Sequence, residues 1–247
     1  ELHFYDDSNS DIRVVSATES NAYPGTEMLR TMALIRDPAF EKPFLLDIFK
    51  AVSGEKHQYD LPFYYMGQVL EVNFEYESPA SLGALGEDNG YQHLYLEGQG
   101  RPGSDNTKFS WMSNNRFYTL TSATHTDDER MFTRLGANDP EFNLRRDAAF
   151  MIRRNAADTI FASVVEAHGS YSPVTENAVN SNSTIAELKV VHDDADYTAV
   201  SIETLDGQKR LFILSNTDAS ATKQHRMEID GSSYQWTGPY QYIESKE

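Results

Sequence analysis

The pair in this sequence best suited to acid–base chemistry is a histidine and a tyrosine two residues apart, His57 and Tyr59. The run from His57 to Tyr65 is rich in aromatic residues and is typical of a β-strand. Because side chains alternate between the two faces of a strand, both residues point to the same face. Such a pair can supply the base and the acid when a proton is removed next to a carboxylate. The alternative, which base rates favour, is that both are hydrogen-bonded structural residues.

A second row of aromatic side chains, Tyr91, His93 and Tyr95, falls on one face of a predicted strand over 91–97. Such rows stack on sugar rings, but they also fill the core of a β-sandwich, and core packing is the first interpretation. Arg116, on a predicted hairpin strand, is suited to neutralising a ligand carboxylate, with a surface salt bridge as the alternative. The sequence singles out no catalytic residue. The candidate substrate-binding residues are therefore His57, Tyr59, His93 and Arg116.

The sequence predicts neither a metal site nor a cofactor in this chain. None of the seven histidines stands at metal-ligand spacing from another. The acid pairs at 127–128 and 193–194 lack a third acid at suitable spacing, and we interpret them as solvated loop charges rather than calcium ligands. Gly98-Gln99-Gly100 is not followed by a helical pattern, so it does not indicate a nucleotide-binding loop.

Turn-forming and cationic residues are concentrated between residues 134 and 153. Residues 136–140 break regular structure, and Arg145 and Arg146 follow before an apolar run. This turn can hold an anionic group or lock two strands in register. The acids of the same stretch favour the second interpretation, because arginines beside acids normally pair with them.

Composition excludes several classes of protein. The net charge of −17 over 247 residues repels nucleic acid and anionic membranes. The absence of cysteine excludes a disulfide framework, and no apolar run is long enough to predict a membrane span. The excess of Tyr and Phe over Trp is typical of strands and of surfaces that face sugars. Because the chain starts at Glu1 without a methionine or a signal peptide, we interpret it as a mature, cleaved or truncated piece.

Many short strand patterns separated by turn residues predict an all-β fold, an antiparallel β-sandwich with a smaller C-terminal β-sheet subdomain. Residues 27–36 are predicted as a strand despite their helix-forming composition, because they lack helix caps. Residues 1–11 are polar and acidic and are predicted as a loop. Asp206-Gly207 and Asp230-Gly231 predict two hairpin turns.

The domain boundary is placed in a stretch rich in Ser, Asn and Thr that shows no periodicity. We predict a main antiparallel sandwich over residues 1–172, incomplete at its N-terminus, then a linker over 173–184. A small C-terminal β subdomain is predicted over 185–247.

Several blocks of this sequence together resemble one family. They are HQYDLPFYYMGQ, NGYQHLYLEGQG, NRFYTLTSAT, RLGANDPEFNLRRDAAFMIRR and SYQWTGPY. In this order they resemble the C-terminal β region of heparinase II/III-like polysaccharide lyases, with the family-17 alginate and oligoalginate lyases as the nearest match. The resemblance runs from about Asp11 to Tyr242.

The resemblance implies a function that this chain performs only in part. Such enzymes join an N-terminal (α/α) toroid to antiparallel β-sheet domains and cleave uronic-acid polymers by β-elimination, often from the chain end. Catalysis needs a group that neutralises the carboxylate, a base for the C5 proton and an acid for the leaving O4. The catalytic residues are expected on the toroid and a structural zinc, where present, in the earlier part of the β region. No catalytic or metal residue is therefore transferred to this chain.

We therefore expect the C-terminal β portion of a secreted or periplasmic alginate lyase that acts exolytically. Its expected partners are a uronic-acid oligosaccharide or polysaccharide such as alginate, and the missing N-terminal toroid of the same enzyme. Two alternatives stay open. One is a stand-alone carbohydrate-binding β module without chemistry, and the other is a lyase that acts on a glycosaminoglycan.

Overall fold

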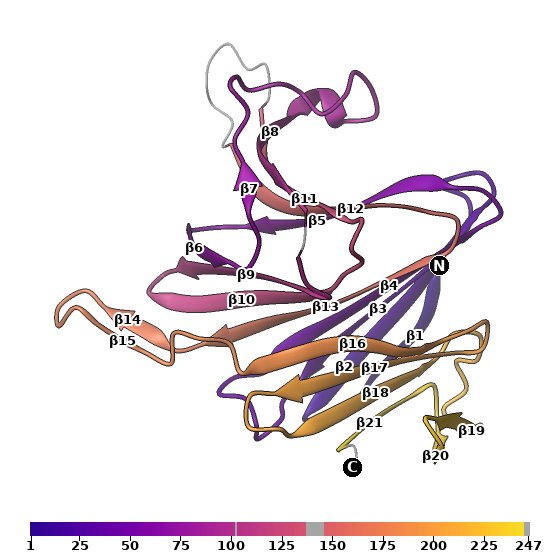
Figure 1. The fold of residues 1–247 in the computed structure, drawn as a ribbon. Coiled ribbons are helices and arrows are strands. Elements are labelled where there is room, and N and C mark those ends of the chain that lie inside the picture. The colour runs from indigo at the N-terminus through magenta and orange to yellow at the C-terminus, as the bar shows by residue number, and fades with distance from the viewer. Residues whose placement is uncertain (102, 137–145, 245–247) are drawn as a thin grey trace.

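The computed structural model describes residues 1–101, 103–136 and 146–244. Within these ranges the regular elements are β-strands and one 3-10 turn, η1 (Tyr91–His93) (Figure 1). Every strand pair recorded within them is antiparallel. The predicted all-β antiparallel class is confirmed. No helix in the described part of the chain is long and apolar enough to cross a membrane.

A central sheet of eight strands forms the middle layer of the molecule. Its first four strands follow the chain in order, and the other four come from later segments. In spatial order the strands are β1 (Leu2–Asn9), β2 (Ile12–Glu19), β3 (Thr26–Ile35), β4 (Phe44–Ser53), β13 (Thr159–His168), β10 (Arg116–Ala123), β9 (Asn106–Ser113) and β6 (Gln68–Val72).

A five-stranded sheet covers one face of the central sheet over β4, β13, β10 and β9. Its strands are β5 (His57–Tyr65), β12 (Ala148–Ala156), β11 (Glu129–Leu135), β8 (Leu94–Gly100) and β7 (Tyr76–Glu77). The core between the two sheets is largely aromatic. Phe109 stacks on Phe150 with ring centroids 5.1 Å apart, and Phe132 packs against both rings.

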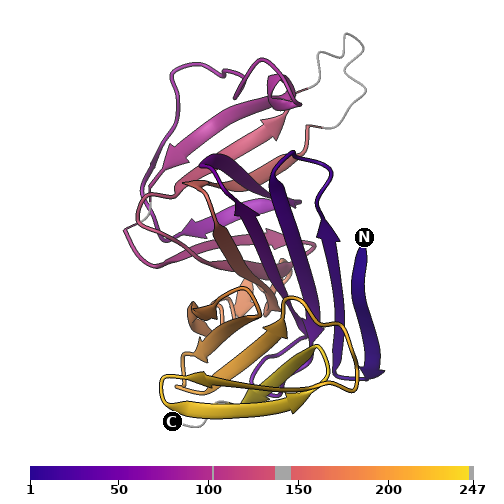
Figure 2. The same ribbon diagram turned by 90° about the vertical axis from the view of Figure 1, so that its right-hand side faces the viewer.

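A four-stranded sheet covers the opposite face, over β1 to β4 and β13 (Figure 2). Its strands are β16 (Ile185–Asp193), β17 (Tyr197–Thr204), β18 (Lys209–Ser215) and β21 (Tyr240–Glu244). Aliphatic side chains dominate this second core, in which Ile202, Phe212 and Leu188 meet Ile35 and Leu46 of the central sheet.

The alternation of side chains along β13 explains why the central sheet can be covered on both faces. Phe161 and Val165 pack into the core with the five-stranded sheet, whereas Ala162 and Val164 pack into the core with the four-stranded sheet. Successive strand residues point to opposite faces, so a nearly continuous apolar run is what a strand buried on both sides requires.

Two short hairpins complete the described structure. One is β14 (Ser170–Ser172) with β15 (Asn177–Val179), and the other is β19 (Gln224–Ile229) with β20 (Ser232–Thr237). The second hairpin packs Met227 and Trp236 against the outer face of the four-stranded sheet. Its turn has positive φ at Asp230 (49°) and Gly231 (81°), the combination that a type I′ turn needs. The hairpin predicted at this Asp-Gly pair is confirmed.

Two local predictions are wrong. Residues 2–9 form strand β1 rather than a loop, because the strand pairs with β2 and buries Phe4 in the core despite its polar sequence. Residues 91–93 form η1 rather than the start of a strand, so Tyr91, His93 and Tyr95 do not form a row on one strand face. The strand predicted at 27–36 is confirmed as β3.

The four-stranded sheet begins at Ile185, the residue at which the C-terminal subdomain is predicted to start. The predicted linker, 173–184, contains strand β15 and thus includes part of a hairpin. The residues on either side of it share one hydrophobic core, which includes Phe44 and Phe212. The division into two domains stays a prediction.

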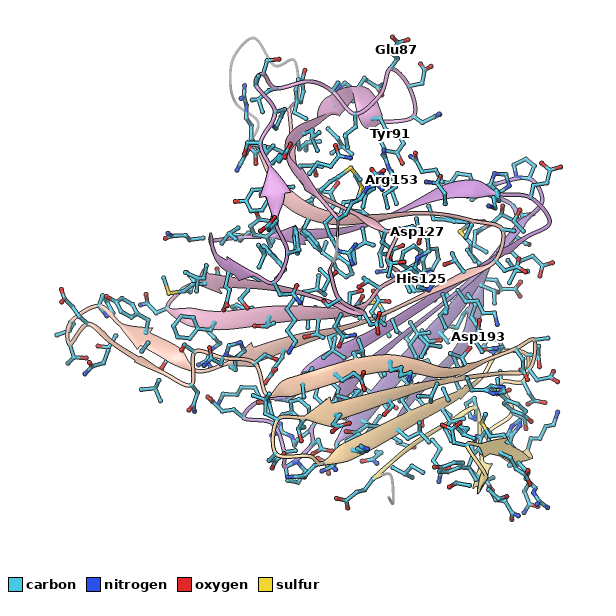
Figure 3. All side chains as sticks on the ribbon, viewed as in Figure 1. Glu87, Tyr91, His125, Asp127, Arg153 and Asp193 are labelled. Atoms are coloured by element: carbon cyan, nitrogen blue, oxygen red, sulfur yellow. The ribbon has the colours of Figure 1, made fainter. Side chains whose placement is uncertain are left out.

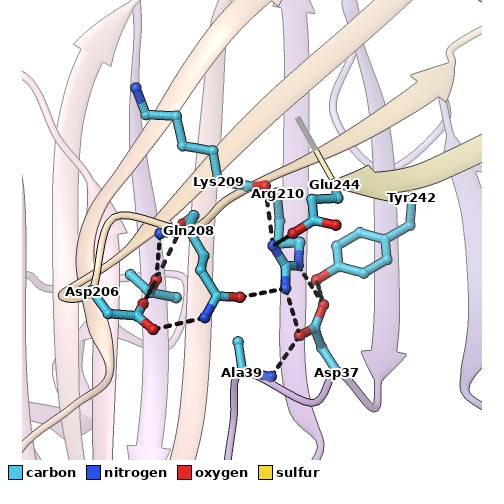
Figure 4. A network of polar contacts seen from close by, with 9 residues as sticks. Asp37, Ala39, Asp206, Gln208, Lys209, Arg210, Tyr242 and Glu244 are labelled. Atoms are coloured by element: carbon cyan, nitrogen blue, oxygen red, sulfur yellow. Dashed lines mark hydrogen bonds and ion pairs between the residues drawn. The ribbon is translucent and has the colours of Figure 1, made fainter. Parts of the chain in front are cut away.

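Charged contacts join the four-stranded sheet to the central sheet at both of its ends. At one end Lys50 of β4 donates to a carboxylate oxygen of Asp193 at 2.7 Å (Figure 3). At the other end Asp37, in the connection between β3 and β4, receives Arg210 Nε at 2.7 Å and the Tyr242 hydroxyl at 2.8 Å (Figure 4). Side chains of Asp37 and Arg210 are at most 8% exposed.

The protonation of Asp37 is controlled by this second contact. Burial alone would raise the pKa of Asp37, but hydrogen bonds from Arg210, the Ala39 amide and Tyr242 outweigh it and lower the pKa below its ordinary value of 3.8. A carboxyl whose pKa is lower in the folded state stabilises the fold above its unfolded pKa, and this contribution is lost as the pH falls through the folded pKa.

We expect Asp37→Asn to lower the free energy of unfolding by about 3 kcal/mol at pH 7, because it leaves a buried arginine without its charge partner. The difference from the unsubstituted chain should shrink as the pH falls from about 4, the ordinary carboxyl pKa, through the lowered folded pKa, because Asp37 is protonated in both states only below the latter. The matched control is Glu244→Gln, which removes an acid 74% exposed from the same arginine. This control should cost less than about 1 kcal/mol. Urea titrations between pH 3 and pH 7 measure both, and equal losses would contradict the assignment.

Candidate functional site

One connected group of polar side chains on the five-stranded sheet is built on β5 and β12. Arg153 and Asp60 are direct partners in the register of these strands, and the guanidinium donates to both carboxylate oxygens at 2.8 Å. Tyr91 of η1 donates its hydroxyl to the same carboxylate at 2.6 Å, and Arg153 lies over its ring (Figure 3). Gly90, with φ of 91°, begins the turn that places Tyr91 there.

The electrostatics of this group leave little scope for proton transfer. Burial and the hydrogen bond to Asp60 raise the pKa of Tyr91 to about 12, so its phenol stays protonated at neutral pH. The hydrogen bond to Asp60 also raises the pKa of Arg153. Asp60 accepts from Arg153 and Tyr91 and is 5% exposed, so its oxygens are occupied. The group therefore anchors the 77–93 connection to the sheet and does not offer a free base.

His57 and Tyr59 lie side by side, as the alternation of strand residues predicts. Their rings are 6.2 Å apart at 79°, at the start of β5. The Tyr59 hydroxyl donates to the Ala157 carbonyl at 3.1 Å, and its ring packs against the aromatic core. Tyr59 thus has a clear structural role, and His57 is exposed. A role of either residue in binding substrate stays a prediction.

His93 and Arg116 lie in other parts of the molecule. His93 is an exposed residue of η1, and its carbonyl accepts the Gly136 amide at 2.7 Å. Arg116 begins β10, where it donates to the Gly169 carbonyl at 3.2 Å and lies 3.8 Å from Glu41. The salt bridge proposed as the alternative role of Arg116 is thus present, and its role in binding stays a prediction.

The structure does not bring the four candidate residues together. His57 pairs with Ala156 just before β13 begins, whereas Arg116 lies beside the far end of the same strand. A strand of ten residues spans roughly 30 Å, so one sugar unit cannot contact both residues. The predicted turn at 136–140 lies outside the described residues apart from Gly136, and so does Arg145.

A second polar cluster lies where the chain passes from β10 to β11. Asp128 is fully buried, and both of its carboxylate oxygens accept from Arg154 at 2.6 Å. The prediction that Asp128 is a solvated loop charge is therefore wrong, although its neighbour Asp127 is exposed. A weak signal is present in the sequence, since Arg154 lies in β12 two residues after a run of buried apolar residues.

The same loop contains a possible set of metal ligands. Within the described ranges, ligand atoms of His125, Asp127 and Asp128 come within 4.8 Å of one another. The bidentate contact to Arg154 occupies Asp128, and the buried guanidinium of Arg130 donates to the Asp128 carbonyl at 2.7 Å. Burial, together with the positive charge of Arg154, lowers the pKa of His125. Two adjacent guanidinium groups disfavour a cation here, and the absence of a metal site stays a prediction.

We expect Asp128→Asn to lower the free energy of unfolding by about 3–5 kcal/mol, because Arg154 would be left buried without its counter-charge. Asp127→Asn is the matched control, since it removes the same charge from an exposed neighbour and should change stability by less than about 0.5 kcal/mol. Denaturant titrations of both variants measure the difference. Similar values for the two would show that the buried ion pair contributes little.

Comparison with known proteins gives no match to any family model. Curated proteins do match over most of the chain. An alginate lyase of Stenotrophomonas maltophilia is 34% identical over 94% of this chain and 31% of its own length. An exo-oligoalginate lyase of Saccharophagus degradans is 31% identical over 96% of this chain and 32% of its own length. The chain thus spans about a third of the length of these relatives.

Solved structures of heparinase III are also similar in part. One covers 97% of this chain and 27% of its own, with a TM-score of 0.49 and 9% identity. Another covers 87% of this chain, with a TM-score of 0.48 and 7% identity. The sequence matches confirm the relationship that the sequence blocks predict. Nearly the whole of this chain is similar to a segment that makes up about one third of an alginate lyase and of an exo-oligoalginate lyase.

Proposed function

We propose that this chain is the C-terminal β portion of an alginate or oligoalginate lyase. The observation that carries the proposal is the identity of 34% and 31% to two such lyases over at least 94% of the chain. The complete protein would cleave uronate polymers by β-elimination and would act from the chain end. Because such polymers lie outside the cell, we place the enzyme in the periplasm or the surrounding medium.

The side chains of this portion support a division of labour in the complete enzyme. β-Elimination needs a base for the C5 proton, and a tyrosine serves only if its hydroxyl is accessible and readily deprotonated. Burial, together with the hydrogen bond to a carboxylate, raises the pKa of Tyr91, Tyr240 and Tyr242. We therefore assign the proton transfers to the remaining two thirds of the enzyme, where an (α/α) toroid is expected. The β layers would support that part and form one wall of the substrate cleft.

The test compares the full-length protein that contains this chain with the 247-residue chain alone. We expect the full-length protein to release unsaturated uronates, measured by ultraviolet absorbance, from alginate oligomers, and the chain alone to release none. For an exolytic enzyme, absorbance should rise well before the viscosity of polymeric alginate falls. Activity on heparin or hyaluronan alone would replace the proposal with a glycosaminoglycan lyase. No activity on any of these polymers would favour a binding module.

A further inference from the structure

A polar cleft of about 260 Å³ lies where the outer strands of the central sheet meet the start of the four-stranded sheet. Strands β6, β9 and β10 form its floor, and Ser183 and Leu205 belong to its opposite wall. Its volume lies just below the range of about 300–1,000 Å³ that is usual for sites of drug-sized ligands. The cleft therefore suits one or two sugar units.

The floor of this cleft departs from the apolar pattern of the sheet around it. Across the strands, Val164 of β13 is opposite Thr121 of β10, which is opposite Lys108 of β9. Val164 belongs to the core beneath the four-stranded sheet, so the same sheet face changes from apolar to polar within three strands. The next row repeats the change, with Glu166, Thr119 and Ser110 as partners. Polar groups at buried positions are costly unless they have partners.

Most of these polar groups are held in place by hydrogen bonds. Ser110 and Thr119 share a hydrogen bond of 2.8 Å, Thr119 and His168 Nε2 share one of 2.9 Å, and His168 Nδ1 lies 2.8 Å from the Asn180 carbonyl. The Ser183 hydroxyl donates to Glu166 at 2.6 Å. The floor is therefore preorganised, although the Thr121 hydroxyl is buried without a partner.

Lys108 differs from most of the other enclosed cations in the described residues, a difference that it shares with buried Arg130, whose partners are a hydroxyl and a carbonyl oxygen. Lys50, Arg153, Arg154 and Arg210 each contact a carboxylate within 2.8 Å. Lys108 donates to the Ile185 carbonyl at 2.7 Å, and no ion pair joins it to any acid within the described ranges. Burial lowers the pKa of Lys108, with Glu166 and Glu71 acting in the opposite direction. An ammonium group has three donors, so two are left for a ligand that enters the cleft.

We propose that this cleft binds a uronic-acid unit of an oligosaccharide, with Lys108 contacting the sugar carboxylate and Ser110 and Asn182 contacting ring hydroxyls. The choice of a uronic acid rests on the proposed function, because such units are the material on which the complete enzyme would act. A uronate would place a carboxylate in direct contact with Lys108, whose nearby acids Glu166 and Glu71 act on it without forming an ion pair in the described residues. The sugar hydroxyls match the hydroxyl and amide groups of the cleft. Glu71 also lines the cleft, where its carboxylate would accept a hydrogen bond from a further sugar hydroxyl.

The test measures binding of saturated mannuronate and guluronate trisaccharides to the 247-residue chain by calorimetry at low salt, with cellotriose as the uncharged control. We expect uronate binding that weakens as salt is added. Lys108→Met should lower the affinity at least about tenfold, the effect of losing a charge-assisted hydrogen bond. The matched control is Lys56→Met, in the exposed turn between β4 and β5, which should bind as the unsubstituted chain does.

A second pair of variants avoids any effect on folding. Asn182 is exposed at the rim of the cleft, so Asn182→Asp should weaken uronate binding and Asn182→Lys should strengthen it. No binding by the unsubstituted chain would overturn the proposal, and so would unchanged affinity in Lys108→Met. If Lys108→Met does not fold, equal affinities of the two Asn182 variants would overturn it.

The same experiment separates this proposal from the proposed function. If the chain binds uronates through Lys108 but the full-length protein has no lyase activity, the binding site is supported and the proposed lyase function is contradicted. If the full-length protein has lyase activity but binding does not depend on Lys108, the proposed lyase function is supported and the proposed binding site is contradicted.

Discussion

The structure depends on two strands of the central sheet, β4 and β13, that are covered on both faces. Leu46 and Ile48 of β4 pack beneath the four-stranded sheet, and Phe49 packs beneath the five-stranded sheet. A strand in this position can leave few side chains in water, so its residues must be apolar or must bring their own partner. Asp47, 6% exposed, satisfies this condition by binding Arg30 of β3 at 2.6 Å. The layers on either side are thereby fixed relative to one another.

Buried acid–arginine pairs at the edges of the layers add specificity to this packing. Arg154 joins β12 to the connection before β11, and Arg210 joins β18 to the connection after β3. Each arginine donates to both oxygens of one carboxylate, a geometry that fixes the orientation of the guanidinium as well as its distance. Arg153 uses the same geometry with Asp60 to hold the connection that contains η1. Among the described residues no carboxylate contacts Lys108, which instead donates to the Ile185 carbonyl beside the cleft.

The sequence was sufficient to predict the fold class and several turns, because alternation and Asp-Gly pairs are local signals. It also placed His57 beside Tyr59 correctly. The strand at residues 2–9 was missed because its sequence is polar, and only pairing with β2 and the burial of Phe4 identify it. Asp128 is buried against Arg154, which is 26 residues away along the chain. Lys108 donates to the carbonyl of Ile185, which is 77 residues away. With 38 acidic residues in the chain, no local pattern shows which carboxylate becomes buried or which lysine is left without a carboxylate partner.

The shared position of β13 has a consequence for how the molecule loses its structure. Phe161 and Val164 belong to different hydrophobic cores, yet they lie three residues apart on one strand. Detachment of β13 would open both cores at once, because each core requires side chains of this one strand. The aliphatic core and the aromatic core are therefore coupled through β13, and the packing in each opposes local opening of the other at that strand.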